Sequence, residues 1–459
     1  MSLLLVPNRV TANRARIWVG TFGPSVPSYF DLQCRSGGGS WGSVAASVSW
    51  STAGFGSSSR VRYQRIDVSL SPGTAYQFRA RRSSKTLGRC ELETLPASLP
   101  ASGRDLVVFL GSCFERQRDK TLKVGRAYRK LYKSGRHRPH LKFLTGDQVY
   151  LDAPVQNFIL TSKKLFLGKS FHRAYHQTWT QGGNSHAGFG WLLRNGANVF
   201  TSDDHEFWNN YPTNSVLLPQ LGDHKQRKMW KKLAQELYRA IQTDRTHEQL
   251  DVPPLSFFVL DSRINRTRSK LRFTTGSNLD RLLKWAKELE GPGVLVIGQP
   301  LFSDPGDWKD SSLAHFDQYA DLVRALRRSN HDIVVLTGDV HFGRVASCKL
   351  NVTRGTRLYE VISSPMALLP GAHSRCEGNL GTFPTRPVSG VPPQSISRHR
   401  TVRAVSGDAK RTEDHFMTVS FRDLGDGVRM RVRAWLPRRK PPTNSELPKR
   451  DWTYETILR

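Results

Sequence analysis

Residues with the chemistry of metal ligands follow several short apolar runs of this sequence, each at the point where the run ends. The runs and their endings are LVVFL followed by GSC (106–113), KFL followed by TGDQVY (142–150), NVF followed by TSDDHE (198–206), FFVL followed by DSR (257–263) and IVVL followed by TGDVH (333–341). In open α/β sheets, sites form beyond the carboxyl ends of the strands. If these runs are strands of such a sheet, their carboxylates, imidazoles and thiol meet on one rim.

A carboxylate-rich set with a few nitrogen and sulfur donors suits a dinuclear centre of hard or intermediate cations. Taken singly, each aspartate is equally well explained as a turn or helix-capping residue. The five endings together favour the metal centre. Two metal ions about 3.5–4 Å apart can bind the attacking and leaving oxygens of a phosphoryl group and lower the pKa of a bridging water.

The apolar runs also predict the elements that position these residues. Most of them lack alternation, which is typical of strands covered on both faces. The stretches between them are amphipathic and place two sets of residues each on one helix face: Trp230, Leu233, Leu237 and Ile241, and Leu282, Trp285 and Leu289. Alternating strands and helices predict an α/β domain. Two further strands are expected within 416–436, and 160–196 and 365–412 are expected to form loops over the site.

Residues 1–96 have the pattern of a small β-sandwich. The segments 15–19 and 63–70 alternate with period two between Gly, Ser and Pro turns. In 71–82 a Pro-Gly turn precedes alternating Tyr76, Phe78 and Ala80, which resembles the fibronectin type III pattern. At 97–104 the composition shifts to Pro, Ser and Ala, which indicates a linker. The α/β domain, with the C-terminal strands, then covers 105–459.

Seven short motifs resemble, in their order, the series of the PhoD-like alkaline phosphatases and phosphodiesterases of the metallophosphatase superfamily. They are GSC (111–113), GDQVYLD (146–152), DDHEFWNNY (203–211), LDSRINR (260–266), GQPLF (298–302), GDVHFGR (338–344) and SSP (363–365). The resemblance implies an αββα sandwich metallophosphatase domain preceded by a fibronectin III-like β-sandwich.

The resemblance also implies a metal-ligand set. Asp147 matches the carboxylate that bridges the metals, and Cys113 and Tyr150 match thiolate and phenolate ligands of a ferric ion. Asp204, Asp339 and His341 match the remaining metal positions, which the family shares between iron and calcium. Other divalent metals are the alternative cofactors. From the residues alone, Cys113 is better explained as a buried core thiol, and Tyr150 as an ordinary half-buried aromatic residue.

Four residues are expected to act on the substrate. His205 matches a position that ligates, protonates the leaving group or orients substrate, with a supporting role behind the ligands as the alternative. Arg263, and then Arg266, match an arginine-bearing motif that can hold phosphate oxygens bidentately. Surface arginines of a basic chain are the competing explanation for both. Asn209 lies close enough in sequence to help shape the pocket.

The chain is strongly basic, with 69 Lys and Arg against 38 Asp and Glu and a formal net charge of +31. Such a field attracts nucleic acid, an anionic membrane surface or phosphate-bearing substrates. The excess is dispersed along the sequence rather than concentrated in one block. This favours a solvated surface that steers anions over a dedicated nucleic-acid site.

Cysteine usage and the N-terminal segment bound the class further. The five cysteines show no CxxC spacing and no even framework, which argues against a zinc ribbon or a disulfide scaffold. The run MSLLLVPNRV is too short, and lacks the preceding charged segment, for a signal peptide or a membrane span. We expect a cytoplasmic protein without a transmembrane segment, with a secreted mature form as the alternative and no predicted oligomeric state.

Together these patterns predict hydrolysis of a phosphomonoester or phosphodiester by a metal-activated hydroxide. No nucleophilic side chain is needed, which fits the lack of a GxSxG or P-loop motif. The substrate is expected to be a phosphate ester, and the positive field favours a polyanionic one. The alternatives are a phospholipase D-like phosphodiesterase, and a catalytically inactive basic protein that binds nucleic acid or another polyanion on the same scaffold.

Overall fold

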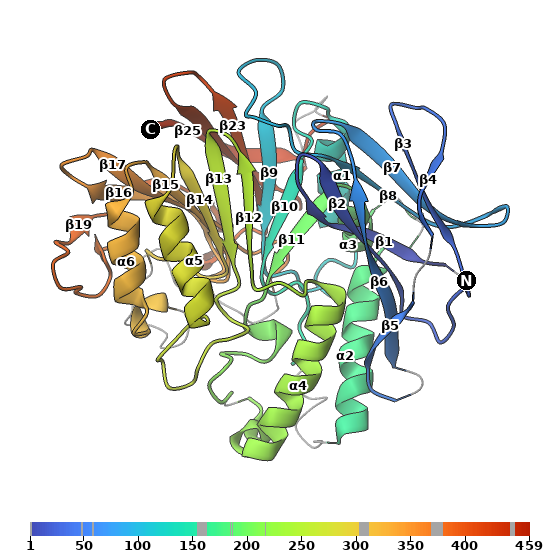
Figure 1. The fold of residues 1–459 in the computed structure, drawn as a ribbon. Coiled ribbons are helices and arrows are strands. Elements are labelled where there is room, and N and C mark those ends of the chain that lie inside the picture. The colour runs from blue at the N-terminus through green and yellow to red at the C-terminus, as the bar shows by residue number, and fades with distance from the viewer. Residues whose placement is uncertain are drawn as a thin grey trace.

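The structure, a computed structural model, describes residues 2–46, 49–56, 59–153, 163–183, 185, 187–215, 217–302, 312–368, 380–440 and 446–459. The chain begins with a two-sheet β-sandwich, drawn in blue in Figure 1, and continues into a larger α/β part. One sandwich sheet has the order β1 (Leu4–Val10), β2 (Arg14–Thr21), β6 (Arg60–Ser69), β5 (Ser51–Gly54). The other has the order β4 (Gly42–Ala46), β3 (Asp31–Ser36), β7 (Ala75–Arg82), β8 (Lys85–Glu93).

Two mixed sheets form the centre of the larger part. The first has the order β11 (Ala197–Thr201), β10 (Leu141–Thr145), β9 (Leu106–Gly111), β23 (Phe416–Asp423), β24 (Val428–Leu436), β25 (Lys449–Leu458). The second has the order β12 (His247–Val252), β13 (Leu255–Leu260), β14 (Gly293–Ile297), β15 (Ile333–Thr337), β17 (Thr356–Ser363), β16 (Gly343–Asn351), β20 (Ser397–Thr401). The sheets pack face to face through aromatic contacts such as Phe143 of β10 against Phe257 of β13.

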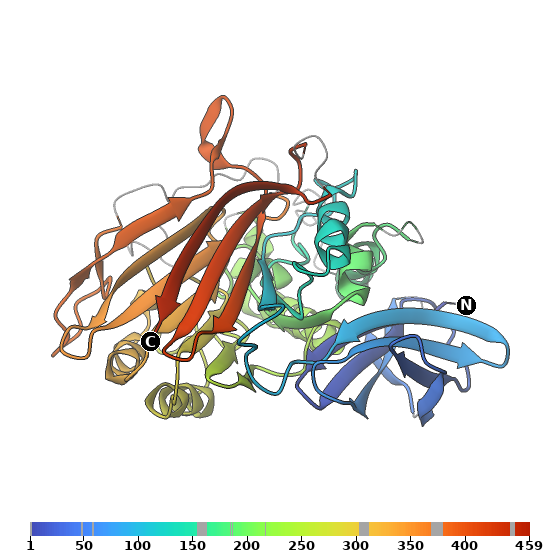
Figure 2. The same cartoon turned by 90° about the horizontal axis from the view of Figure 1, so that it is seen from above.

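Helices cover both outer faces of this pair of sheets (Figures 1 and 2). The first sheet packs against α1 (Lys123–Lys133), α3 (Phe189–Arg194) and the end of α2 (Lys164–Trp179), and the second against α5 (Gly276–Lys287) and α6 (Tyr319–Arg328). The helix α4 (His224–Ile241) packs against α2 and against β5 and β6 of the sandwich. The layers are therefore helix, sheet, sheet, helix, which confirms the predicted αββα sandwich with an N-terminal β-sandwich. Among the described residues, no helix is both long and apolar enough to cross a bilayer.

Most of the predicted elements are present. The buried, non-alternating runs form β9, β10, β13, β14 and β15, and every residue of β9, β10, β14 and β15 is buried. The two amphipathic stretches form α4 and α5, and 416–436 forms β23 and β24.

The loops expected over the site are only partly present. Within 160–196 the prediction is wrong, because α2 and α3 occupy much of this segment, with Phe171, Tyr175 and Trp179 buried on one side of α2. In 365–412 the structure has β20 and short strands: β18 (Thr382–Phe383), β19 (Gln394–Ser395), β21 (Ala404–Val405) and β22 (Asp408–Thr412). Residues 154–162 and 369–379 lie outside the described residues.

Parallel pairing brings the predicted site residues to one rim. β9, β10 and β11 run parallel in the first sheet, and β13, β14 and β15 run parallel in the second. Their carboxyl ends therefore lie at the same edge of the paired sheets, where ligand sites form in such folds.

The β-sandwich is attached to the larger part by buried hydrogen bonds at the end of α4. The last carbonyls of a helix lack partners within the helix. Trp18 Nε1 donates to Ala240 O (2.7 Å) and Asn8 Nδ2 donates to Gln242 O (2.8 Å). In the other direction, Asn198 Nδ2 of β11 donates to Pro7 O (2.7 Å). One apolar cluster also runs from the sandwich into the core between the sheets, so the two parts share a hydrophobic core.

This shared interface predicts a single cooperative unfolding transition that depends on Trp18. Trp18→Phe removes the shorter of two hydrogen bonds to the buried Ala240 carbonyl and leaves that from Arg65 Nη2 at 3.2 Å. We expect this loss to lower the free energy of unfolding by about 0.5–1.5 kcal/mol. Denaturant unfolding, followed by fluorescence and far-UV circular dichroism, measures the change. Trp50→Phe, at a half-buried tryptophan inside the sandwich, is the control and should cost less. Loss of the sandwich signal in a separate, earlier transition would contradict the prediction.

Candidate metal centre

Two groups of buried side chains lie close enough to hold metal ions at the rim of the sheets. The first comprises Asp147, Asp204 and His205, and the second comprises Asp203, Asp204 and Asp339. Within each group, one ligand atom per residue lies within 4.8 Å of the others. Asp204 belongs to both, so the groups are adjacent and form one centre with room for two cations.

The backbone is strained at several of the predicted ligands. Cys113, Asp147, Asp339 and His341 have φ angles of 53°, 57°, 69° and 58°, in the left-handed region that favours glycine. They are four of the eight non-glycine residues with positive φ in the described chain. Each such residue costs about 1–3 kcal/mol, and strain of this kind concentrates at functional sites. The strain therefore marks this rim as functional, independently of the donor chemistry.

Glycines allow the strand ends to approach one another. Gly146 has a φ of 95°, and a Cβ there would lie 2.4 Å from the Cβ of Asp203. A Cβ on Gly338 would lie 2.3 Å from Ser112 Oγ. Each glycine precedes an aspartate of the site, so the Gly-Asp pairs bring the carboxylates of both sheets together.

Cys113 and Tyr150 lie beside the two groups. The Cys113 thiol is 3.4 Å from Asp147 Oδ2, and Ser364 Oγ donates to Cys113 Sγ at 3.1 Å. Tyr150 packs its ring against His205, with 4.3 Å between centroids. Its buried hydroxyl has no hydrogen-bond partner among the described residues, and neither does Asp203 Oδ2. A buried polar atom without a partner is costly unless something binds it, so these atoms fit a metal centre.

The centre carries more negative charge than its own cations offset. Burial, followed by the nearby Asp204 and Asp203 carboxylates, raises the pKa of Asp147 well above its usual range despite the opposing charge of His205. Burial and Asp204 raise the pKa of Asp339 to about 6. Burial and the charges of Asp147 and Asp339 likewise raise the pKa of the Cys113 thiol. A bound cation reverses this balance and favours the ionised forms.

Two further buried carboxylates, Glu206 and Asp261, accept hydrogen bonds from the protein and hold the strand ends of the rim in place. Glu206 accepts hydrogen bonds from the backbone N–H groups of Asp147, Gln148 and Asp203 at 2.8–2.9 Å, which fixes the ends of β10 and β11 together. Asp261 accepts from Ser202 of the first sheet and from the backbone of Arg263 and Ile264. Their oxygens are used within the protein, so they hold the ligands in place.

His205 is oriented by a carboxylate that the sequence did not single out. Its Nδ1 lies 2.8 Å from Asp152 Oδ1, and the second oxygen of Asp152 accepts from the backbone N–H of Asn209 at 2.7 Å. A carboxylate on one imidazole nitrogen fixes the ring and leaves the other nitrogen for a metal ion or a proton. Nε2 of His205 is therefore the atom available for chemistry.

The predicted arginines are buried and engaged by protein groups. Arg263 Nε donates to Asp203 Oδ1, Nη1 donates to Tyr211 O at 2.7 Å, and Nη2 lies 3.8 Å from Asp339 Oδ2. Arg266 donates to Gln299 Oε1 and to Ser262 O. In this arrangement Arg263 offsets the charge of the aspartates, and the predicted phosphate contacts of both arginines stay predictions.

The other predicted residues also lie at the rim. The backbone N–H of His341 donates to Ser364 Oγ at 3.2 Å, and the charge of His341 is among those that lower the pKa of Asp204 against the opposing effect of burial. Asn209 is half-buried and borders the centre through Asp152. All the predicted site residues thus lie at or beside one rim, and their individual roles stay predictions.

Four residues with a place in the site were given no role from sequence: Asp152, Asp203, Glu206 and Asp261. All four lie inside the quoted motifs; Asp261 directly follows a strand and Glu206 directly follows His205. The adjacent pair Asp203 and Asp204 contained the signal for Asp203. No pattern in the sequence separates a carboxylate that accepts backbone hydrogen bonds from one with free oxygens.

An αββα sandwich with a carboxylate-rich centre at the strand ends defines the metallophosphatase class of folds. Comparison with solved structures bears this out. The structure of PhoD matches with a TM-score of 0.62 and 13% identity over 99% of this chain and 91% of its own. Purple acid phosphatase PPD1 from yellow lupin seeds matches with a TM-score of 0.53 and 9% identity, over 95% and 72%. No protein-family model and no curated protein matches the chain by sequence. The likeness confirms the predicted PhoD-like metallophosphatase fold.

The shared position of Asp204 predicts how metal content responds to substitution. Asp204→Asn removes a ligand from both groups and should reduce bound metal at two positions, whereas Asp339→Asn should affect one. Elemental analysis of the purified variants measures this. Asp321→Asn, an exposed aspartate of α6, is the matched control and should retain the wild-type content. Full metal content in Asp204→Asn would contradict the two-group arrangement.

The raised pKa values predict an unusual pH dependence for the metal-free protein. The pKa of Asp339 is about 6 and that of Glu206 about 7, both raised by burial, whereas unfolded Asp and Glu titrate at about 3.9 and 4.3. Folding stability from these groups is full below pH 4 and is lost as the pH rises through 6 and 7. Chelator-treated protein should therefore melt at lower temperature at pH 8 than at pH 5, and added metal should reduce the difference. Equal melting temperatures without metal would contradict it.

Proposed function

We propose that this chain is a metal-dependent phosphoester hydrolase. The observation that supports this best is the pair of adjacent ligand groups that share Asp204, at the strand ends of a PhoD-like fold. A centre of this composition has the chemistry to act on an anionic, oxygen-rich group such as a phosphoester. The acidic cluster alone would suit several cations, and the fold favours phosphoryl chemistry among them.

The residues fit a mixed centre of iron and calcium. The Cys113 thiol and the Tyr150 phenol are ligand types that suit a ferric ion, and both lie on the Asp147 side of the centre. Asp203, Asp204 and Asp339 offer the hard carboxylate oxygens that suit calcium or another divalent ion. When bound, such ions lower the pKa of a water molecule and offset the charge of the phosphoryl oxygens.

The side chains around the centre have separate tasks in this proposal. Asp152 holds Nδ1 of His205, and Nε2 carries the proton that the leaving oxygen receives. Arg263 holds Asp203 in place and offsets the negative charge that gathers as the substrate phosphate enters. Arg266 keeps Gln299 directed at Asp203, because Gln299 Nε2 donates to Asp203 Oδ1 at 2.9 Å.

The test is hydrolysis of p-nitrophenyl phosphate and bis(p-nitrophenyl) phosphate by the metal-loaded protein. His205→Ala should lower kcat by about 10²–10⁴-fold, because it removes the proton donor. It should retain metal, because four ligands of this proposal remain on that side of the centre: Asp147, Asp204, Cys113 and Tyr150. Asp152→Asn should lower activity about 10–100-fold. Asp321→Asn is the control and should retain full activity.

Two outcomes would contradict parts of this proposal. If His205→Ala loses metal together with activity, His205 is a ligand rather than the proton donor. If the metal-loaded protein cleaves neither ester, the hydrolase proposal fails. A visible charge-transfer band that disappears in Tyr150→Phe would identify iron bound to the phenolate.

A further inference from the structure

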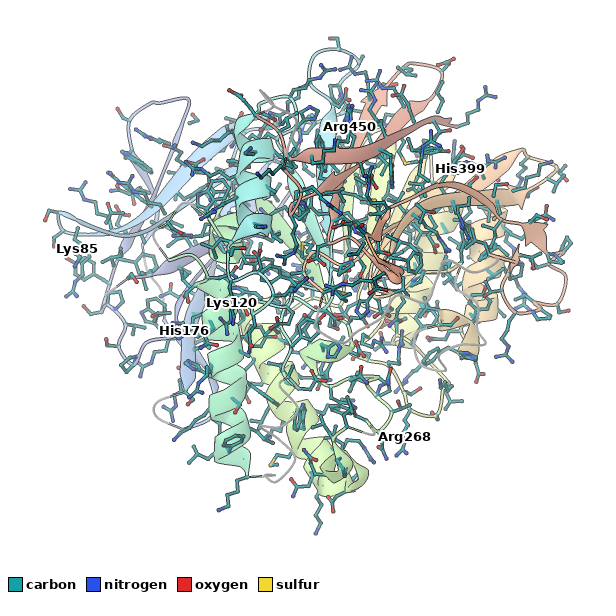
Figure 3. All side chains as sticks on the ribbon, turned by 180° about the vertical axis from the view of Figure 1, so that it is seen from behind. Lys85, Lys120, His176, Arg268, His399 and Arg450 are labelled. Atoms are coloured by element: carbon teal, nitrogen blue, oxygen red, sulfur yellow. The ribbon has the colours of Figure 1, made fainter. Side chains whose placement is uncertain are left out.

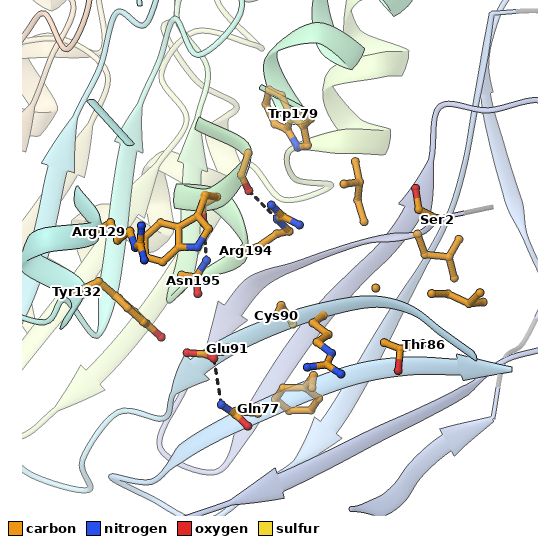
Figure 4. Close-up of a pocket in the computed structure, with 18 of the residues that line it drawn as sticks. Ser2, Gln77, Thr86, Cys90, Glu91, Arg129, Tyr132, Trp179, Arg194 and Asn195 are labelled. Carbon is orange, nitrogen blue, oxygen red and sulfur yellow. Dashed lines mark hydrogen bonds between the residues drawn. The ribbon is translucent and has the colours of Figure 1, made fainter. Parts of the chain in front are cut away.

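A large cavity lies between the β-sandwich and the α/β part, and the residues of the metal centre do not line it. Its volume is about 1120 Å³, slightly above the roughly 300–1,000 Å³ of ordinary small-molecule sites. One wall is formed by β7 and β8 of the sandwich and the other by α1 and α3 (Figure 4).

The lining of this interdomain cavity is strongly basic. Glu91 is the one acidic residue among its lining residues, against seven arginines and lysines. The sandwich contributes Arg35 and Arg89, the linker Arg104, and the α/β part Arg129, Lys133, Arg138 and Arg194. The basic residues labelled in Figure 3, by contrast, are spread widely over the molecule. The cavity therefore brings seven cations together in one place.

Two of these seven cations, Arg104 and Arg138, approach a carboxylate of the sandwich. Arg104 pairs with Glu93 at 2.8 Å, and Arg138 lies 3.9 Å from the same carboxylate. Arg35 donates to the neutral Gln77, and Arg194 donates to two backbone carbonyls.

Within the described part of the chain, no ion pair is formed by Arg35, Arg89, Arg129, Lys133 or Arg194. Like charges gathered in a partly enclosed space repel one another, and an anionic ligand removes this cost.

The wall between the two parts is fixed in place. Buried Lys142 donates to the carbonyls of Asn195 (2.6 Å) and Gly196 (2.5 Å), where α3 ends. Gly196 N–H in turn donates to Glu91 O of β8 at 2.7 Å. Glu91 accepts from Gln77 at 3.1 Å, as drawn in Figure 4. The cavity is thus a preformed feature of the domain interface.

Planar groups stand at one edge of the cavity. Trp41 is half-buried, and the guanidinium carbons of Arg35 and Arg79 lie 4.7 Å and 4.1 Å from its ring centroid. Indole and guanidinium planes are surfaces on which nucleobases stack. A linear anion without rings cannot stack on the indole or guanidinium planes. Unpaired cations and planar groups together match the grooves that bind single strands.

We propose that the interdomain cavity binds single-stranded nucleic acid. The phosphates contact the exposed Arg89 and Lys133 and the half-buried Arg129, and a base stacks at Trp41. This binding is independent of the metal centre and of the proposed hydrolysis, so either proposal can fail without the other.

The test uses the full chain, stripped of metal by a chelator, and the fluorescence anisotropy of a labelled 15-nucleotide oligo-dT. Arg89→Glu/Lys133→Glu should raise Kd at least tenfold. It should also reduce the slope of log K against log salt by about 1.4, because a single strand contributes about 0.7 per phosphate contact. Lys284→Glu/Lys287→Glu on α5, on the far side of the molecule, makes the same change in net charge and should leave Kd within about twofold (Figure 1). Equal weakening by both pairs would overturn the proposal, because binding would then follow the overall charge.

A second measurement separates nucleic acid from other polyanions. Trp41→Ala should weaken oligo-dT binding at least fivefold, in line with about 1–3 kcal/mol for a stacked base. It should leave the affinity for inorganic polyphosphate unchanged, and Trp41→Phe should restore oligo-dT binding. Circular dichroism and melting temperature check that the variants fold, and Arg89→Gln replaces the double variant if that one does not. Polyphosphate or duplex DNA that binds more tightly than oligo-dT would overturn the assignment.

Discussion

Four aspartates approach one another inside this protein, at the ends of strands from both central sheets, with few protein cations to offset them. Arg263 is the counter-charge in direct contact, through Asp203 and near Asp339. Repulsion in a buried, low-dielectric site is far stronger than in water, and it is expressed in the raised pKa of Asp147, Asp203 and Asp339, for which burial is the largest cause. The mutual repulsion of these carboxylates opposes folding, and a bound cation would reduce it. The strained φ angles at Cys113, Asp147, Asp339 and His341 act in the same direction, because a conformation this costly persists only where the surroundings impose it.

The arrangement of the four aspartates depends on neighbouring carboxylates that have different hydrogen-bond partners. Glu206 and Asp261 accept several hydrogen bonds each from backbone and side-chain donors of the protein, and so hold the strand ends at fixed positions. Asp203 keeps one buried oxygen without a hydrogen-bond partner among the described residues, although Arg263 engages the other. Asp152 lies behind these residues and contacts Nδ1 of His205, so it affects the centre by orienting that imidazole ring. These buried carboxylates are exposed to solvent to nearly the same small extent. Their hydrogen-bond partners therefore decide which of them can bind a metal ion and which hold the backbone in place.

The difference between carboxylates with and without backbone partners explains which features of the site could be predicted from the sequence. Residue type and position after a strand predicted the αββα layers, β9, β10, β13, β14 and β15, and a rim that collects Cys113, Asp147 and Asp204, because buried strands and their endings have strong local patterns. The roles of Asp152 and Glu206 depend on which backbone N–H groups face them, which is a property of the folded chain alone. The expected loop at 160–196 was wrong for a related reason. The apolar face of α2 is interrupted by His, Lys and Arg, and its buried aromatic residues pack against α4, which is distant in sequence.

Part of the excess positive charge of the chain is concentrated at the interface between the β-sandwich and the α/β part. Five cations line one cavity although they span 159 positions of the sequence: Arg35, Arg89, Arg129, Lys133 and Arg194. Arg129 and Lys133 lie one turn apart on α1, and the other three come from distant segments. They come together because the sandwich is attached rigidly, through Trp18 at the end of α4 and through β8 at the end of α3. A sandwich joined by a flexible linker would hold these charges apart, since their mutual repulsion opposes the contact. The buried hydrogen bonds and the shared apolar core overcome that repulsion, so the interface that stabilises the fold is also what concentrates the positive charge.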